Sequence, residues 1–234
     1  MRIAVRYGRR GPAKYVSHLD MQRTIGRAIR RARLHACYSH GFNPHLQMSF
    51  ASPLSVGYET DADYIELEVE SDQSIEEALG ALTAAAPPGI VFRNVYRIPD
   101  GFGKLMARCD SASYEVRFKL ASDAESDYHV LQNTLGHLQE STSYTAADKK
   151  GRIRDIRPMI RELTWNDRSA FMRLANSSSA SLNPAVVADA LLAESGLSGT
   201  YDVRRTECYA LGPNGPTPFS VLLEGAAQSA NAPG

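Results

Sequence analysis

The sequence has few cysteines, no long apolar run and no apparent export signal. Its three cysteines, Cys37, Cys109 and Cys208, are odd in number and widely separated, which favours reduced thiols over a disulfide framework. No stretch reaches the roughly 18 apolar residues that a membrane span needs, and no apolar signal-peptide core follows the N-terminus. We therefore expect a cytoplasmic protein that makes no contact with a membrane.

The common catalytic and cofactor motifs are also missing. Gly101-Phe102-Gly103 lacks the rest of a dinucleotide fingerprint, and there is no phosphate-binding Gly-Lys-Ser/Thr loop and no Gly-x-Ser-x-Gly elbow. Three distant cysteines cannot hold the iron–sulfur cluster of an enzyme that cleaves S-adenosylmethionine. We therefore predict no catalytic residue and no cofactor, and we favour a role that is not enzymatic.

Acidic residues are scarce in the first fifty residues, and basic residues are missing from the segment that follows. The first fifty residues carry ten Lys or Arg and a single carboxylate, Asp20, whereas residues 51–92 carry nine carboxylates and no Lys or Arg. The formal net charge of the chain is +0, so the two signs are sorted along the sequence. Such sorting produces a local positive field that attracts polyanions.

The order of predicted elements indicates an α+β fold. A strand over 2–7, a helix from Ser17, a strand over 64–70, a helix over 74–86 and a strand over 90–98 approximate the βαββαβ order of ferredoxin-like folds, and 114–211 repeats this order. On strand 64–70 we expect the apolar residues to face inward and the three glutamates outward. We predict two tandem ferredoxin-like domains, at 1–107 and 108–225, followed by a disordered tail at 226–234.

The first predicted helix has one apolar and one basic side. Apolar residues recur every three or four positions, which predicts a face that packs on a sheet. The four arginines on the opposite side are Arg23, Arg27, Arg30 and Arg31. Guanidinium groups on a rigid helix suit phosphate contacts, but these arginines could instead pair with the acidic segment 59–77.

A polar loop, Tyr38-Ser-His-Gly-Phe-Asn-Pro-His45, follows this helix. Together with His35 and Cys37 its histidines form a string of potential zinc donors, although the spacing matches no standard structural site. A second interpretation uses His18, His40 or His45 as a general acid or base in RNA cleavage. In the third, the histidines with Ser39 and Asn43 only hold the loop in shape through hydrogen bonds.

A second basic segment, residues 149–161, lies in the other half of the chain. It includes Lys149, Lys150, Arg152 and Arg154, and leads into a predicted strand. A phosphate-binding surface and a solvated basic hairpin both fit this composition. Near the first basic segment, Tyr15, Tyr38 and Phe42 are candidates for stacking on exposed bases, although core packing is the more common use of such residues.

Four segments carry a resemblance to a known family: Lys14–Asp20, Arg27–Arg31, Tyr38–His45 and Phe50–Gly57. In these the chain resembles the bacterial radical-SAM-linked proteins of unknown function, which occur alone or fused behind a radical S-adenosylmethionine protein. The likeness continues more loosely through Asp155–Pro158 and so extends over nearly the whole chain. Members often have glutamine at position 40, which weakens a catalytic or ligand role for His40.

The resemblance implies a partnership with a radical-SAM enzyme, here a separate polypeptide. Combined with the basic segments, it leads us to expect an accessory protein that presents RNA, either tRNA or rRNA, to that enzyme. The residues expected at the RNA are Arg23, Arg27, Arg30, Arg31, His40, Asn43, His45, Lys149, Lys150, Arg152 and Arg154. The alternatives are a metal-independent RNA-processing enzyme and a protein–protein adaptor.

Overall fold

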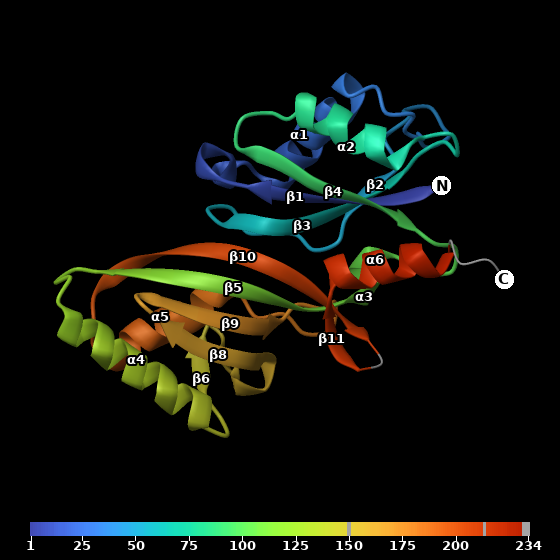
Figure 1. Ribbon diagram of the computed structural model, residues 1–234. Coiled ribbons are helices and arrows are strands. Elements are labelled where there is room, and N and C mark those ends of the chain that lie inside the picture. The colour runs from blue at the N-terminus through green and yellow to red at the C-terminus, as the bar shows by residue number, and fades with distance from the viewer. Residues whose placement is uncertain (149–150, 213, 231–234) are drawn as a thin grey trace. The chain divides into compact units, whose positions relative to one another are not determined.

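The computed structural model describes residues 1–148, 151–212 and 214–230 (Figure 1). The chain divides into two compact units, one formed by residues 1–109 together with 207–234, the other by residues 110–206. The predicted boundaries at 107 and 225 differ from this division because β10 (Gly199–Gly212) runs from the second unit back into the first. The first unit is therefore completed only by the C-terminal part of the chain.

The first unit pairs its strands in the order β4-β1-β3, with β2 on the far side of β3. These strands are β1 (Arg2–Arg9), β2 (Met48–Phe50), β3 (Glu59–Glu68) and β4 (Ile90–Ile98). All three of these pairings are antiparallel. The helices α1 (His18–Arg31) and α2 (Ile75–Ala84) both cover one face of this sheet (Figure 1).

Three short elements complete the first unit. The chain enters α1 through a 3-10 turn at Gly11–Tyr15, and α3 (Leu105–Arg108) follows β4. β11 (Gly215–Pro218) pairs with β10, and α6 (Phe219–Ala230) follows it and packs against β4. Residues 226–230, which the sequence predicts as part of a disordered tail, continue α6.

The second unit has the same sequence of main elements. It contains β5 (Cys109–Leu120), α4 (Glu125–Glu140), β8 (Ile160–Asn166), β9 (Ser169–Ala175) and α5 (Pro184–Ser195). β9 lies between β5 and β8 and is antiparallel to both, while β10 lies on the other side of β5. β6 (Thr145–Ala147) and β7 (Ile153–Asp155) pair in a small hairpin, whose second strand lies in the second basic segment.

A helix cap and a hairpin turn set where elements begin and reverse direction. Ser17 caps α1, since its side chain accepts a hydrogen bond from the Asp20 backbone N–H at 3.2 Å. The β8–β9 hairpin turns after Asn166, and Asp167 there takes a left-handed φ of 53°. Within the described residues, no helix is both long and apolar enough to span a membrane.

The core of the first unit lies between its sheet and its two helices. Ile25, Ala28 and Ile29 of α1 are fully buried against strand residues that include Ile65 and Leu67. This is the apolar face that the three- and four-residue spacing predicts. Since one side of α1 is committed to the core, its arginines are directed away from the sheet.

Candidate nucleic-acid interface

The predicted basic side of α1 exists as one exposed surface, here called the arginine face. It consists of Arg23, Arg27, Arg30 and Arg31, all exposed. From Arg23 to Arg31 the helix rises about 12 Å, so the four guanidinium groups occupy a short row. A fixed row of permanently charged groups suits repeated contact with phosphates.

Two of these four arginines are held by neighbours. Arg23 pairs with Asp20 at 3.1 Å, and the Arg31 guanidinium donates to the Ala85 carbonyl at 3.0 Å. Hydrogen bonds from Ser17 and then Arg23 hold the pKa of Asp20 below its usual value. In the described part of the chain, Arg27 and Arg30 have no ion pair or side-chain hydrogen bond, so they are the most available cations of the face.

The acidic strand does not neutralise the arginine face. On β3 the apolar residues Ile65 and Leu67 face the helices, and Glu66 and Glu68 alternate to the opposite side of the sheet. There they pair with other cations: Lys104 Nζ lies 3.0 Å from Glu66 and 3.6 Å from Glu68. The internal pairing considered from sequence is therefore not formed at these two glutamates.

Glu66 corrects the expectation that the strand glutamates face solvent, since it is only 3% exposed. Its carboxylate accepts hydrogen bonds from Arg2 Nε at 2.9 Å and from the Leu105 backbone N–H at 3.0 Å, in addition to the Lys104 ion pair. A buried carboxylate needs such compensation because burial otherwise disfavours its charge. Part of this compensation comes from α3, which covers this side of the sheet.

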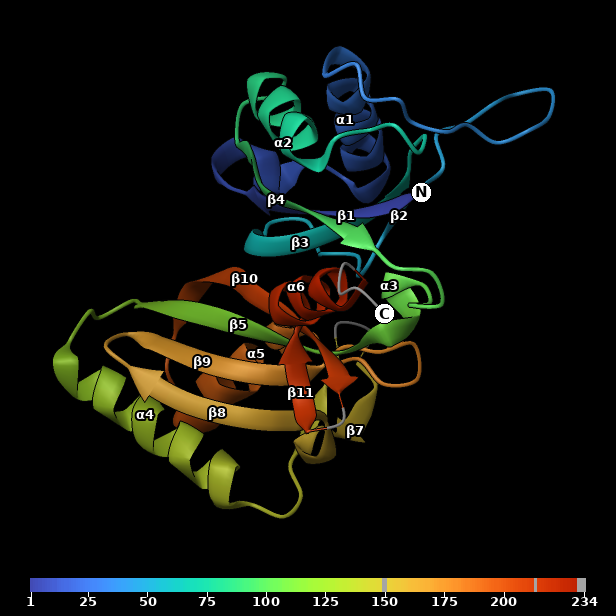
Figure 2. The same ribbon diagram turned by 45° about the vertical axis from the view of Figure 1, so that its right-hand side comes forward.

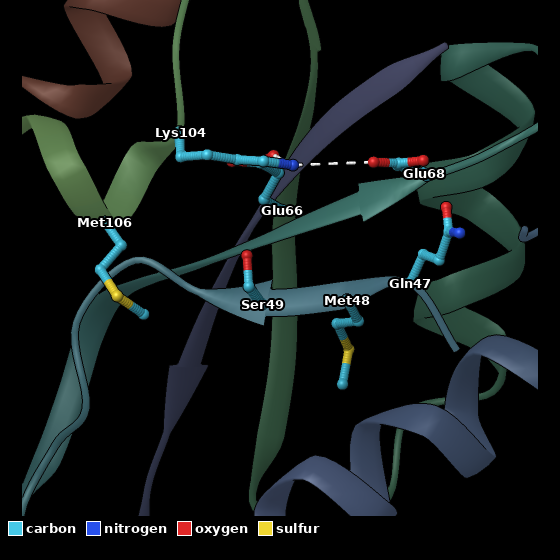
Figure 3. A pocket seen from close by; sticks show the side chains of 7 residues that line it. All are labelled: Gln47, Met48, Ser49, Glu66, Glu68, Lys104 and Met106. Atoms are coloured by element: carbon cyan, nitrogen blue, oxygen red, sulfur yellow. Dashed lines mark ion pairs between the residues drawn. The ribbon is translucent and has the colours of Figure 1, made fainter. Parts of the chain in front are cut away.

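The same side of the sheet carries a pocket of about 360 Å³ (Figure 3). Gln47, Met48 and Ser49 of the β2 region and Met106 of α3 line it, together with the Lys104 ion pairs. Figure 3 shows the Lys104 side chain reaching across to both glutamates. Because its cation is already paired with two carboxylates, the pocket offers a polyanion no net positive charge.

The polar loop after α1 forms a closed hairpin over residues 38–46. Tyr38 and Leu46 make an antiparallel bridge, and the Ser39 backbone N–H donates to the His45 carbonyl at 2.8 Å. The Ser39 hydroxyl contacts His45 Nδ1 at 2.7 Å and accepts from the His45 N–H at 3.1 Å. The hairpin projects from the unit as the blue loop in Figure 2. These contacts support the interpretation in which Ser39 and His45 hold the loop in shape.

The hairpin begins beside the arginine face. Gly26 of α1 is buried, and a Cβ at this position would lie 3.8 Å from Leu46 Cδ2. Arg23 and Arg30 stand three residues before and four residues after Gly26, so they lie on the same side of the helix. The hairpin base therefore lies beside the arginine face, a proximity that could not be predicted from local sequence patterns.

The potential zinc donors are dispersed. Cys37 Sγ lies 3.7 Å from Glu70, and burial followed by the Glu70 charge raises the pKa of its thiol. His35 pairs with Asp72 at 3.3 Å, and the His18 ring packs edge-on against Phe50 at 4.9 Å. Across residues 1–148, 151–212 and 214–230, no three His, Cys, Asp or Glu side chains are grouped so as to hold a metal ion. His40 and Asn43 are exposed in the hairpin.

The second basic segment is largely engaged within its own unit. Arg152 pairs with Asp148 at 2.6 Å, and Arg154 donates to the Ser181 carbonyl at 3.1 Å. Arg157 donates to three carbonyl oxygens, including that of Ser141. Arg152 and Arg154 are both exposed, while the predicted contacts of Lys149 and Lys150 lie outside the described residues.

Comparison with known proteins gives a family without an assigned activity. A family described as "Uncharacterized protein conserved in bacteria (DUF2344)" matches residues 2–184. No curated protein matches the chain. One similar solved structure is an unknown protein from Galdieria sulphuraria, with 12% identity over 86% of this chain and 97% of that one, at a TM-score of 0.24. A TM-score of this size does not establish a shared fold.

Proposed function

The chain belongs to the bacterial DUF2344 family of uncharacterized proteins, and from its surface we propose that it is a non-catalytic RNA-binding accessory protein. The observation that carries this proposal is the arginine face, whose Arg27 and Arg30 make no ion pair or side-chain hydrogen bond among the described residues. The neighbouring glutamates Glu66 and Glu68 belong to the other side of the sheet. A row of guanidinium groups in which Arg27 and Arg30 make no ion pair is an electrostatic site for a phosphate backbone.

We also propose a fold for each unit, a partner and a cellular location, none of which the family match provides. Each unit has the βαββαβ order of main elements, and the pairing order of its strands supports a ferredoxin-like fold for both. The resemblance to radical-SAM-linked proteins supports a radical-SAM enzyme as the partner that receives tRNA or rRNA. A cytoplasmic location accords with an enzyme partner and with an RNA ligand.

The contribution of the second basic segment has weaker support. Arg152 and Arg154 are exposed, but Arg152 already has a carboxylate partner and Arg154 donates to a carbonyl. That Lys149, Lys150 and these arginines share one RNA groove with the arginine face stays a prediction. We therefore assign the main phosphate contacts to α1.

The test is a titration of RNA binding against salt. Four phosphate contacts on a single strand predict a slope of about −3 for log Kobs against log salt, because each contact releases condensed counterions. The double variant Arg27→Gln/Arg30→Gln removes the two available cations and should reduce the slope by about 1.4. The matched control is Arg117→Gln, an exposed arginine of β5 outside both basic segments.

Other outcomes overturn the proposal in different ways. Absence of RNA binding at low salt removes it altogether. RNA cleavage without added metal that is lost in His40→Ala or His45→Ala would replace it with the enzymatic alternative.

Purification of the tagged chain with an iron–sulfur protein, before and after nuclease treatment, tests the partner. Recovery only with RNA present supports presentation of RNA, while recovery after nuclease treatment supports a protein–protein adaptor.

A further inference from the structure

The tip of the hairpin 38–46 carries an aromatic side chain with no cover. Phe42 has a relative exposure of 103%, the largest of the exposed apolar side chains in the described part of the chain. Phenylalanine normally stabilises a fold by removing its ring from water, so an exposed ring at a loop tip contributes nothing to the core. Its full exposure leaves the ring of Phe42 open to contact with another molecule.

The hairpin is built to present this ring. Its base is closed by the Tyr38–Leu46 bridge and by the contacts between Ser39 and His45. Just before the ring, Gly41 takes a φ of 134°, a conformation that other residues rarely adopt. The closed base limits how Phe42 moves relative to α1, to which the hairpin is attached through Leu46.

The other two aromatic candidates are less suited to stacking. The ammonium group of Lys14 lies 5.5 Å from the Tyr15 ring centroid, so one face of that ring already has a cation over it. Tyr38 is 39% exposed, and its backbone belongs to the hairpin base. Phe42 alone among the three combines full exposure with a position at the tip.

The surroundings of the ring favour a nucleic acid over an apolar protein surface. The hairpin 38–46 contains no carboxylate, and its polar residues His40, Asn43 and His45 can donate and accept hydrogen bonds. Leu46 at its base lies 3.8 Å from where a Cβ at Gly26 would stand, and Gly26 lies between Arg23 and Arg30 in the sequence of α1. Cationic contacts to phosphates beside an exposed aromatic ring are the two elements of single-strand recognition.

We propose that Phe42 stacks on an unpaired base of the RNA whose phosphates lie along the arginine face. The inference rests on the proposed RNA-binding function and narrows its substrate class to RNA with single-stranded or bulged nucleotides. Bases inside a duplex are already stacked on both sides, so the ring finds no free π-face there. The phosphates of either form can still reach the arginines.

The experiment compares one short RNA strand with the same strand annealed to its complement. Phe42→Ala should weaken binding of the single strand about 5- to 100-fold, the range of a lost base–aromatic stack, and leave duplex binding unchanged. Phe42→Leu should behave like Phe42→Ala, because it keeps apolar bulk and loses the π-face. Met106→Ala, a half-exposed side chain on the other side of the sheet, serves as the matched control.

A fluorescence measurement locates the contact. The chain has one tryptophan, Trp165, so the double variant Phe42→Trp/Trp165→Phe carries a unique reporter at the hairpin tip. Single-stranded RNA should quench its emission, and duplex RNA should not. Binding that requires the arginines but is insensitive to Phe42, or an equal loss with both RNA forms, overturns the stacking inference alone. Absence of any RNA binding overturns the proposed function with it.

Discussion

At the scale of single residues, Glu207 is a largely buried acid, its side chain 13% exposed, whose protonation should affect stability. Its carboxylate accepts hydrogen bonds from the Tyr64 hydroxyl at 2.8 Å and the Cys208 backbone N–H at 2.9 Å, and it pairs with Arg6 at 3.2 Å. Burial outweighs these partners and raises the pKa of Glu207 above its ordinary value of 4.5. The neutral acid is thus favoured more in the folded chain than in the unfolded one.

The expected result is a loss of stability as pH rises above about 4.5 through the raised pKa of Glu207. In this window the unfolded chain releases the proton first, so ionisation favours unfolding. Glu207→Gln cannot ionise and should show a smaller decrease. Urea unfolding of both proteins across this range measures the difference, and parallel pH profiles would contradict the assignment.

Single residues also show which features could be predicted from the sequence and which could not. The alternation on β3 correctly placed Ile65 and Leu67 in the core, because the period of two is a local property of a strand. It failed for Glu66, whose surroundings are set by Arg2 and by α3, far away in sequence. Likewise the sequence indicates Phe42 as one of three aromatic candidates for stacking on bases, but the exposure of its ring depends on the fold.

At the scale of elements, α1 shows why a helix can be predicted while its contacts cannot. The Ser17 cap and the apolar spacing are local and were confirmed. The position of Leu46 beside Gly26 depends on tertiary packing, and residues 226–230 of α6 were assigned to a tail because they are small and polar. Elements whose stability comes from packing leave a weak sequence signal.

Two glycines of the first unit should respond in opposite ways to alanine. Gly26→Ala should raise the free energy of unfolding by about 0.5–1 kcal/mol, since the new Cβ meets Leu46 Cδ2 at an ordinary 3.8 Å within a helix. Gly89→Ala should lower it by about 1–3 kcal/mol, because φ is +81° and the Cβ would lie 2.7 Å from the Arg10 carbonyl oxygen. Urea unfolding of both variants against the parent protein provides the measurement. Equal effects of the two changes would be inconsistent with these geometries.

At the scale of the whole molecule, the two units predict which fragments fold. Residues 110–206 form one unit without a break in the sequence and should unfold cooperatively as an isolated fragment. Residues 1–109 alone lack Phe219 of α6, which is fully buried and packs edge-on against Tyr64 at 5.4 Å. This fragment should bind a hydrophobic dye and unfold without a sharp transition.

Joining residues 207–230 to 1–109 through a Gly/Ser linker is the matched control, because it restores α6. The linked form should recover cooperative urea unfolding. If 1–109 unfolds as sharply without these residues, the C-terminal segment is not needed to complete the first unit. The sequence-based boundary at 107 would then serve for that fragment.

The return of β10 from the second unit to the first also affects how the chain is made. A ribosome synthesises residues 110–206 before Glu207–Ala230, so the interior unit is the first for which every part has been made. The unit that carries the arginine face stays incomplete until Glu207–Ala230 has also been made. Any chaperone that acts during synthesis would therefore meet the N-terminal half of this chain for longer than its position suggests.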